Sequence, residues 1–176
     1  DTLFLQNGYV KLLFNNSTQV FLEAPVRFQI VSDSEIKLLA GKICADVPEN
    51  AHGFTIYTDN ASVIDLGTRF GVHADRFGNT NVYVIEGKAR LQVDSGSQSQ
   101  FVLEAGTAKG VSQTRIISDL KYRDGVFVQK IDSATGMSWR GQDRLSLADI
   151  AGGGGNRQNK YLIEPSRNGG TLISTP

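Results

Sequence analysis

A two-residue alternation of apolar and polar side chains in the middle of the chain restricts the fold most. Within residues 63–75, one parity holds Ile64, Leu66, Thr68, Phe70, Val72 and Ala74, and the other holds Asp65, Gly67, Arg69, Gly71, His73 and Asp75. This period is that of a β-strand with one buried and one solvated face. Residues 54–58 and 82–84 continue the pattern on either side, so we expect consecutive strands separated by polar turns.

Shorter runs of the same kind occupy most of the remaining chain. Residues 9–14, 20–24 and 26–30 read as three strands, with turns at 15–18 and 32–34 and a strand end or edge at Pro25. The signal weakens after Ser112, where 114–120 predicts a last strand and 126–131 an edge strand. This layout predicts an all-β fold: short stacked, mostly antiparallel strands in a β-roll or solenoid-like sandwich, followed by an irregular C-terminal arm.

An internal repeat adds a prediction about three glycines. Residues 36–47 align with 82–93, which places Gly41 on Gly87, and a weaker copy at 101–106 ends at Gly106. The apolar parity reverses across the first two glycines, so a straight strand would expose half of its apolar side chains. Glycine lacks a Cβ and tolerates positive φ. We therefore predict bulges or corners at these glycines, where the chain passes from one sheet to the next.

Length and composition limit the domain count and the partners. A chain of 176 residues with 40% hydrophobic residues can bury one core. We assign residues 1–131 to an all-β domain and 132–176 to a glycine-rich arm or a linker toward a missing downstream module. The chain starts at Asp1 rather than Met, which leads us to expect a processed or excised piece. Eighteen basic and 18 acidic residues cancel, which argues against nucleic-acid binding.

Catalytic and metal-binding sets are not evident in the sequence. The chain has two histidines, His52 and His73, and a single cysteine, Cys44, which excludes an intrachain disulfide. His73 and Asp75 share a strand face, but two ligands do not make a metal site. No nucleophile, base and oxyanion donor assemble in the pattern. We expect a protein that binds without a cofactor and does not catalyse a reaction.

The central motifs resemble a known family. Residues 63–72, Val-Ile-Asp-Leu-Gly-Thr-Arg-Phe-Gly-Val, with Gly-Phe-Thr-Ile-Tyr-Thr before them and Leu-Glu-Ala-Gly at 103–106, are similar to the FecR family of bacterial regulators. The resemblance covers residues 12–111. It implies that Leu66, Gly67, Thr68 and Phe70 are fold-making residues, with Gly67 at a close strand contact or bulge and Phe70 in the core. Arg69 departs from relatives that carry Glu there.

The resemblance implies a periplasmic sensor domain of a membrane-anchored regulator of an extracytoplasmic-function sigma factor, with iron-siderophore uptake as the best-known setting. The implied partner is the signalling domain of an outer-membrane transporter. The sigma factor would be bound by a cytoplasmic segment, and the membrane crossed by a helix, both outside this chain. As the candidate interaction face we select Asp65, Arg69, His73, Tyr57 and Tyr83.

A surface carbohydrate-binding or adhesive β module is the alternative. The tail at 145–155 is similar to the segment that comes after this domain in large proteins of planctomycete-like bacteria, where a lectin-like module can come next. A sugar site requires exposed aromatic side chains in a shallow groove, and the candidates are Tyr57, Tyr83 and Tyr122. A hydrolase ranks third because no catalytic set is visible.

Overall fold

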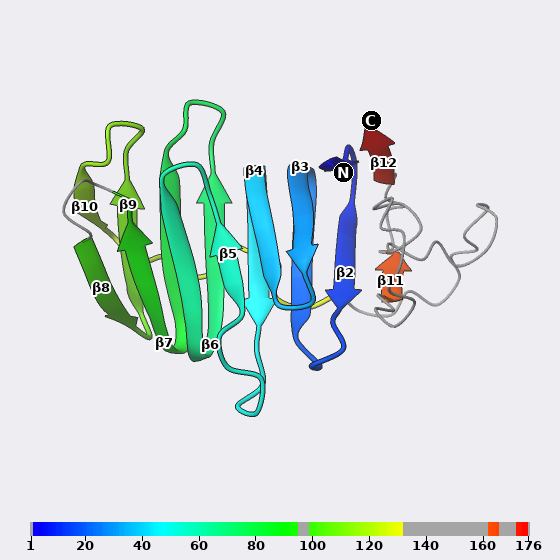
Figure 1. The fold of residues 1–176 in the computed structure, drawn as a ribbon, viewed down its shortest axis with the longest axis horizontal. Coiled ribbons are helices and arrows are strands. Elements are labelled where there is room, and N and C mark those ends of the chain that lie inside the picture. The colour runs from blue at the N-terminus through cyan, green and yellow to red at the C-terminus, as the bar shows by residue number, and fades with distance from the viewer. Residues whose placement is uncertain (1, 95–98, 132–161, 166–171, 176) are drawn as a thin grey trace.

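The computed structural model describes residues 2–94, 99–131, 162–165 and 172–175, and within them it contains twelve strands and no helix (Figure 1). The all-β prediction is confirmed. The strands are β1 (Thr2–Leu5), β2 (Tyr9–Leu13), β3 (Gln19–Ser32), β4 (Glu35–Asp46), β5 (Thr55–Tyr57), β6 (Ala61–Ala74), β7 (Thr80–Val93), β8 (Ser99–Glu104), β9 (Thr107–Val111), β10 (Ile117–Leu120), β11 (Leu162–Pro165) and β12 (Leu172–Thr175).

Four long strands, β3, β4, β6 and β7, each pair with different neighbours in their two halves. The first half of β7 pairs with β9 and the second half with β8, while β4 pairs first with β5 and then with β6. Likewise, β3 pairs first with β2 and then with β1. The strands therefore form two layers, in which layer A contains β1, β5 and β8, layer B contains β2, β9 and β10, and the long strands belong to both.

The hydrophobic core lies between these layers. One continuous cluster joins buried side chains of layer A, such as Phe28 and Ile56, to those of layer B, such as Phe70 and Val84. Phe14 and Phe54 meet edge to face with ring centroids 5.0 Å apart. Among the described strands, all but one of the pairings are antiparallel; the exception is β4 with β5.

Glycines mark the points where β4 and β7 change layer. The apolar side chains switch sides across Gly41 and Gly87, since Leu38 and Ile43 are both buried, as are Val84 and Ala89. Gly41 has φ +105° and Gly87 has φ +73°. A Cβ on Gly41 would lie 2.5 Å from the carbonyl oxygen of Pro25, and one on Gly87 only 2.0 Å from that of Gly67. No other residue fits at these bends without movement of the backbone.

The partner strands bend at matching places. The β3–β4 register shifts between Glu23 and Arg27, and the β6–β7 register shifts between Asp65 and Thr68. Gly106 lies in the turn that takes the chain from β8 in layer A to β9 in layer B. We call this row of layer changes, at Pro25, Gly41, Gly67, Gly87 and Gly106, the bend line.

Four details of the sequence prediction are wrong. Strand β6 does not alternate uniformly, because its bulge places Asp65 inside and leaves Leu66 36% exposed. Residues 20–24 and 26–30 belong to one strand, with Pro25 at its bend rather than at its end. Strand β1 was not predicted. Residues 126–131 form no strand.

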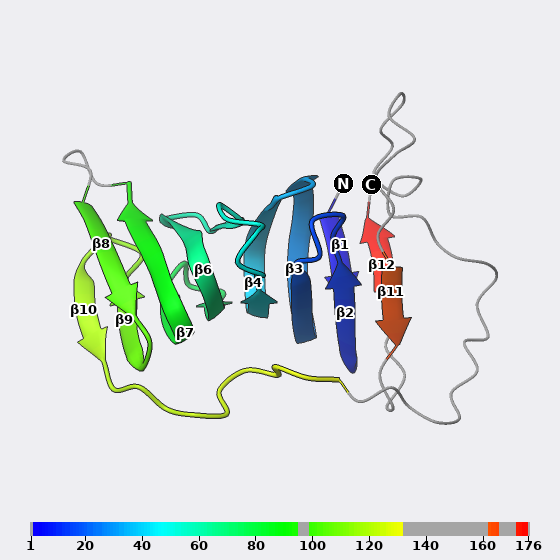
Figure 2. The same ribbon diagram turned by 90° about the horizontal axis from the view of Figure 1, so that it is seen from below.

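Residues 121–131 instead cross the outer face of layer B, and we call them the strap (Figure 2). Phe127 packs there against Phe21 and Cys44. A Cβ on Gly71 would lie 2.5 Å from the Phe127 ring, so the glycine makes room for the strap. A side chain too large for this gap would displace the strap from the sheet.

The C-terminal part contributes two further strands. Strand β11 pairs antiparallel with β2, and β12 pairs antiparallel with β1. Neither strand was predicted. The glycine run at 152–155 and the motif at 145–155 lie outside the described residues, and the domain boundary at 131 stays a prediction.

Candidate interaction surfaces

The five residues selected from the sequence do not share one face. Arg69, His73 and Tyr83 lie on the layer B halves of β6 and β7 and point outward, whereas Tyr57 lies on β5 in layer A. Asp65 is fully buried, so the prediction that it lies on an exposed face is wrong. The cause is the bulge in β6, which reverses the side of every residue before it.

Arg69 links three adjacent strands of layer B. Its guanidinium donates to Asp46 on β4 at 2.8 Å and to Glu86 on β7 at 3.1 Å. The hydrogen bond to Asp46 raises the pKa of Arg69, with burial acting in the opposite sense. Because both carboxylates come from neighbouring strands, this arginine is engaged within the sheet.

His73 sits half-buried further along the same strand. Burial and the Lys42 ammonium lower the pKa of His73, and the carboxylates of Asp75 and Glu23 partly oppose them. The imidazole is therefore neutral at pH 7. A neutral, half-covered ring adds little charge to the outer face of layer B.

Tyr83 is covered by the strap. Its ring lies 5.5 Å from that of Phe127 and 6.1 Å from that of Tyr122, measured between centroids. Beneath the same strap, burial raises the pKa of the Cys44 thiol to about 12. The Cys44 thiol is therefore protonated and unreactive, and Tyr83 and Tyr122 pack on the protein's own chain.

Asp65 carries an incompletely satisfied carboxylate at the β6 bend. One oxygen accepts a hydrogen bond from the Gly67 amide at 3.0 Å. The other has no hydrogen-bond partner within the described residues and lies 3.9 Å from Nδ1 of His52, an exposed side chain. Burial raises the pKa of Asp65, while the surrounding hydrogen bonds and His52 act against it. We infer that the Asp65 carboxylate stabilises the bend in β6.

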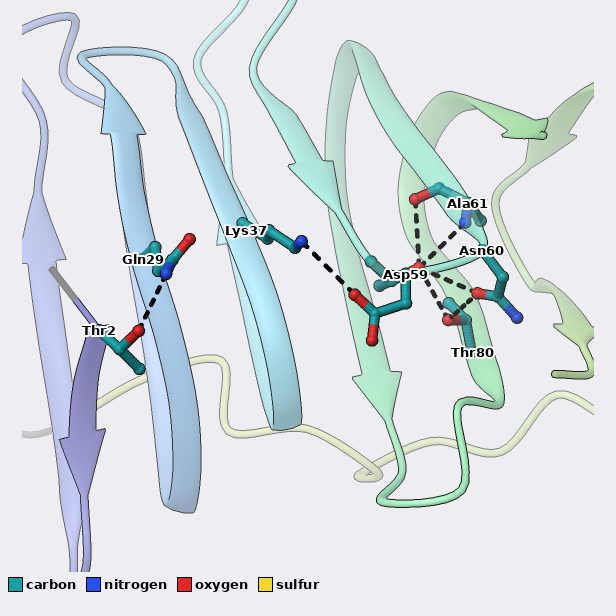
Figure 3. A network of polar contacts seen from close by, with 8 residues as sticks. Thr2, Gln29, Lys37, Asp59, Asn60, Ala61 and Thr80 are labelled. Carbon is teal, nitrogen blue, oxygen red and sulfur yellow. Dashed lines mark hydrogen bonds and ion pairs between the residues drawn. The ribbon is translucent and has the colours of Figure 1, made fainter.

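Tyr57 borders a shallow, polar depression on layer A. The depression has a volume of about 240 Å³ and is lined by residues 57–62 and 92–94. The Tyr57 hydroxyl donates to Glu35 at 2.8 Å, which raises the pKa of the phenol. Asp59 faces Lys37 at 3.5 Å on the neighbouring strand (Figure 3). Of the three tyrosines named from the sequence, Tyr57 is the one that lines an open groove.

Asn60 joins three turns at one end of the sandwich, a role the sequence reasoning missed. Its amide nitrogen donates to the carbonyls of Gly78 (2.9 Å), Val111 (3.1 Å) and Ser112 (2.8 Å). Its amide oxygen accepts from the hydroxyl of Thr80 at 2.6 Å (Figure 3). A buried asparagine with all these bonds fixes the turns at 58–60, 75–79 and 112–116 to one another. We call these three turns the turn platform.

The two hairpin turns of the platform are also braced internally. The Asp75 carboxylate accepts from the amides of Phe77 (2.8 Å) and Asn79 (2.9 Å), and Asn79 accepts from the Gln113 amide at 3.0 Å. Burial raises the pKa of Asp75, but the hydrogen bonds from the Asn79 side chain and from the amides of Asn79 and Phe77 outweigh it and lower that pKa. Ser112 closes the other turn by accepting from the amide of Ile116 at 3.0 Å.

Metal-binding and membrane-spanning features are not found in the described ranges. Within residues 2–94 and 99–131, no three side chains of the metal-ligating types come together. No helix long and apolar enough to cross a membrane occurs in the part of the chain that the structure describes.

Comparison with known proteins identifies the family. Residues 4–90 match the family described as FecR protein. The chain belongs to the FecR family. No curated protein matches the chain. The FecR signature residues build the β6 bend: the Thr68 hydroxyl donates to the Lys88 carbonyl, Gly67 has φ +90°, and Phe70 fills the core.

Two crystal structures of a candidate anti-sigma factor from Parabacteroides distasonis resemble this FecR chain. The TM-scores are 0.58 and 0.56, each at 20% sequence identity, over 69% and 68% of this chain. This likeness shows that the fold is shared. The FecR chain spans 60% of the length of each of those solved chains.

Proposed function

We propose that this FecR-family chain is the periplasmic sensor domain of a membrane-anchored regulator of an extracytoplasmic-function sigma factor. The observation that carries the proposal is the family match over residues 4–90, which includes most of both layers. A regulatory role of this kind depends on recognition of another protein rather than on catalysis. The fold resemblance to a candidate anti-sigma factor is consistent with it.

The polar chemistry of the domain also favours recognition. Its buried and half-buried polar groups are used to fix the bends and turns, as Asp65 does at Gly67 and Asn60 does at three carbonyls. Such groups make a rigid body with defined surfaces, which binds a partner with little loss of conformational entropy. In this proposal the partner is the signalling domain of an outer-membrane transporter, with iron-siderophore uptake as the first setting to test.

The experiment is a reporter assay in the organism that encodes the protein. A promoter dependent on the neighbouring sigma factor is placed before a reporter, and the full-length gene is compared with one lacking residues 1–131. We expect the deletion to reduce the induction of the reporter by the siderophore at least tenfold. A response equal to that of the intact gene would contradict the proposal. Fusing a periplasm-dependent phosphatase after residue 131 tests the location.

Glycan binding is a second candidate, favoured by the depression beside Tyr57. An aromatic ring next to carboxylates, amides and hydroxyls is a suitable arrangement for stacking on a sugar and bonding its hydroxyls. A glycan array tests it with Tyr57→Ala and, as matched control, Tyr122→Ala beneath the strap. A saturable hit lost only in Tyr57→Ala would favour this candidate over the regulator, and no hit would remove it.

A further inference from the structure

The turn platform carries the two most exposed large hydrophobic side chains of the described residues. Phe77 is 61% exposed and Ile116 is 68% exposed, and they lie on adjacent turns that share contacts through Asn79 and Gln113. The other exposed large hydrophobics, Val31, Leu66 and Val102, lie on strands. Single apolar side chains on a surface are ordinary. Two on turns joined by a hydrogen bond are less ordinary, and we refer to these two side chains together as the patch.

Each of these side chains is preceded by an arginine. Arg76 stacks its guanidinium 4.9 Å from the centre of the Phe77 ring. Arg115 precedes Ile116 and has φ +64°, a conformation that non-glycine residues rarely adopt. Neither arginine forms an ion pair with another described residue. Each turn therefore carries an exposed apolar side chain and, one residue earlier, an arginine that forms no ion pair with the described residues, and at Phe77 the two side chains are in contact.

The backbone beneath this patch is held rigidly. Asp75 and Ser112 brace the two turns from within, and Asn60 ties them together from below. A patch of fixed shape loses little conformational entropy when it is bound. Phe and Arg are enriched in protein interfaces. Charged groups at the rim of an interface also steer the approach of the partner.

We infer that the turn platform is the docking surface of the FecR chain for its protein partner, and that the partner presents an apolar pocket bordered by carboxylates. The inference rests on the proposed function, because it names where the regulator's partner binds. The pocket receives Phe77 and Ile116, and the carboxylates pair with Arg76 and Arg115. A lipid surface is disfavoured as the partner. Even a single acyl chain binds a membrane only marginally, and two apolar side chains bury less apolar surface than that chain does.

Photo-crosslinking in the organism that encodes the protein locates the contact. Benzoylphenylalanine replaces Phe77 or Ile116 of the full-length protein, and replaces Val31 or Val102 as matched exposed controls. We expect positions 77 and 116 to crosslink to the same protein and the controls not to. Charge reversal by Arg76→Glu with Arg115→Glu should reduce the adduct at least tenfold. Equal crosslinking at all four positions, or adducts with a second copy of this chain alone, would overturn the inference.

Binding and reporter measurements separate the inference from the proposed function. The crosslinked protein is purified, and its affinity for the chain is measured with Phe77→Ser plus Ile116→Ser and with Val31→Ser plus Val102→Ser. We expect the first pair to weaken binding at least tenfold and the second less than twofold. If the sigma-dependent reporter responds normally in the first pair, the docking surface is refuted and the regulator stands. Pelleting of the chain with vesicles containing phosphatidylglycerol, lost in the first pair, would instead assign the patch to lipid.

Discussion

The bend line and the turn platform use similar elements for opposite purposes. Both are built where strands turn or cross, and both depend on backbone groups held by specific side chains, Asp65 at one and Asn60 at the other. At Gly41 and Gly87 of the bend line the neighbouring backbone leaves no space for a side chain, whereas at the platform the apolar side chains face solvent. Changes at the bend line should therefore act on stability, and changes at the platform surface on binding.

The largest effect on stability is expected within the bend line, where two glycines with similar φ differ in the space around them. A Cβ on Gly87 would meet the Gly67 carbonyl at 2.0 Å, while one on Gly106 would have no neighbour within 4 Å. Gly87→Ala should therefore cost more than about 3 kcal/mol or prevent folding, and Gly106→Ala about 1 kcal/mol. Urea unfolding measures both. Equal losses would show that φ alone, and not the close approach of β6, fixes the bend.

Asn60→Ala should give the next largest effect, because the two amide hydrogens shared among three carbonyls and the oxygen that accepts from Thr80 are lost together. Unsatisfied buried polar groups cost about 1–3 kcal/mol each, so we expect a loss of about 3 kcal/mol after partial hydration. Asn50→Ala, at an exposed position in a loop, is the control and should change stability by less than about 0.5 kcal/mol. If the two variants unfold at the same urea concentration, Asn60 does not hold the platform together.

Removing the Phe127 side chain tests the strap, where we expect an effect smaller than at the bend line and larger than at the platform surface. Phe127→Ala should cost about 2 kcal/mol, since its ring is buried in a small cluster rather than in the main core. Cys44, the single cysteine of the chain, lies beneath it and reports opening directly. We expect thiol labelling of Cys44 to become faster in Phe127→Ala and to be unchanged in Phe77→Ala. Slow labelling in both would mean that the strap does not protect this face.

A smaller, pH-dependent effect is expected at His73. Its pKa is lowered in the folded state, so the unfolded chain binds a proton first as the pH falls below about 6.5. His73 therefore disfavours folding increasingly from about pH 7 downward, and His73→Gln should remove that part of the loss. Melting temperatures at pH 7.5 and 5.5 check the sign. A larger drop in the variant than in the parent would contradict it.

The smallest effect on stability should come from Phe77→Ser at the platform surface. The ring contacts Arg76 and solvent, so we expect a change within about 0.5 kcal/mol. Thermal unfolding beside the parent chain measures it. A large loss would make Phe77 part of the fold and would weaken the contrast between platform and bend line.

The sequence was informative where periodicity and glycine act together. The parity reversals at Gly41 and Gly87 predict the layer changes because glycine alone fits there. Periodicity alone did not predict the bend in β6, since Asp65 and Leu66 happen to continue the alternation while the backbone reverses it. The family resemblance did, because it implies a close strand contact or a bulge at Gly67. In the structure the bend is evident from the register shift after Asp65, from the positive φ of Gly67 and from the buried carboxylate bonded to the Gly67 amide.

The interaction surfaces were less predictable than the fold. Asn60 occupies a turn, where asparagine is common for local reasons, so its long-range bonds to Val111 and Ser112 leave no trace in the sequence. The strap has no period because the side chains that pack on the sheet, such as Tyr122, Val126 and Phe127, are irregularly spaced along it. One signal was available: Arg76-Phe77 and Arg115-Ile116 place an apolar residue after arginine in otherwise polar turns.

Shared strands have a consequence for dissecting this protein. Since β3, β4, β6 and β7 each contribute to both layers, no cut between residues 19 and 93 yields a fragment containing one complete sheet. A fragment divided there would separate buried side chains that belong to one continuous core. A tag or second domain therefore belongs in a turn or outside this span, because an insertion within a shared strand would interrupt both sheets at once.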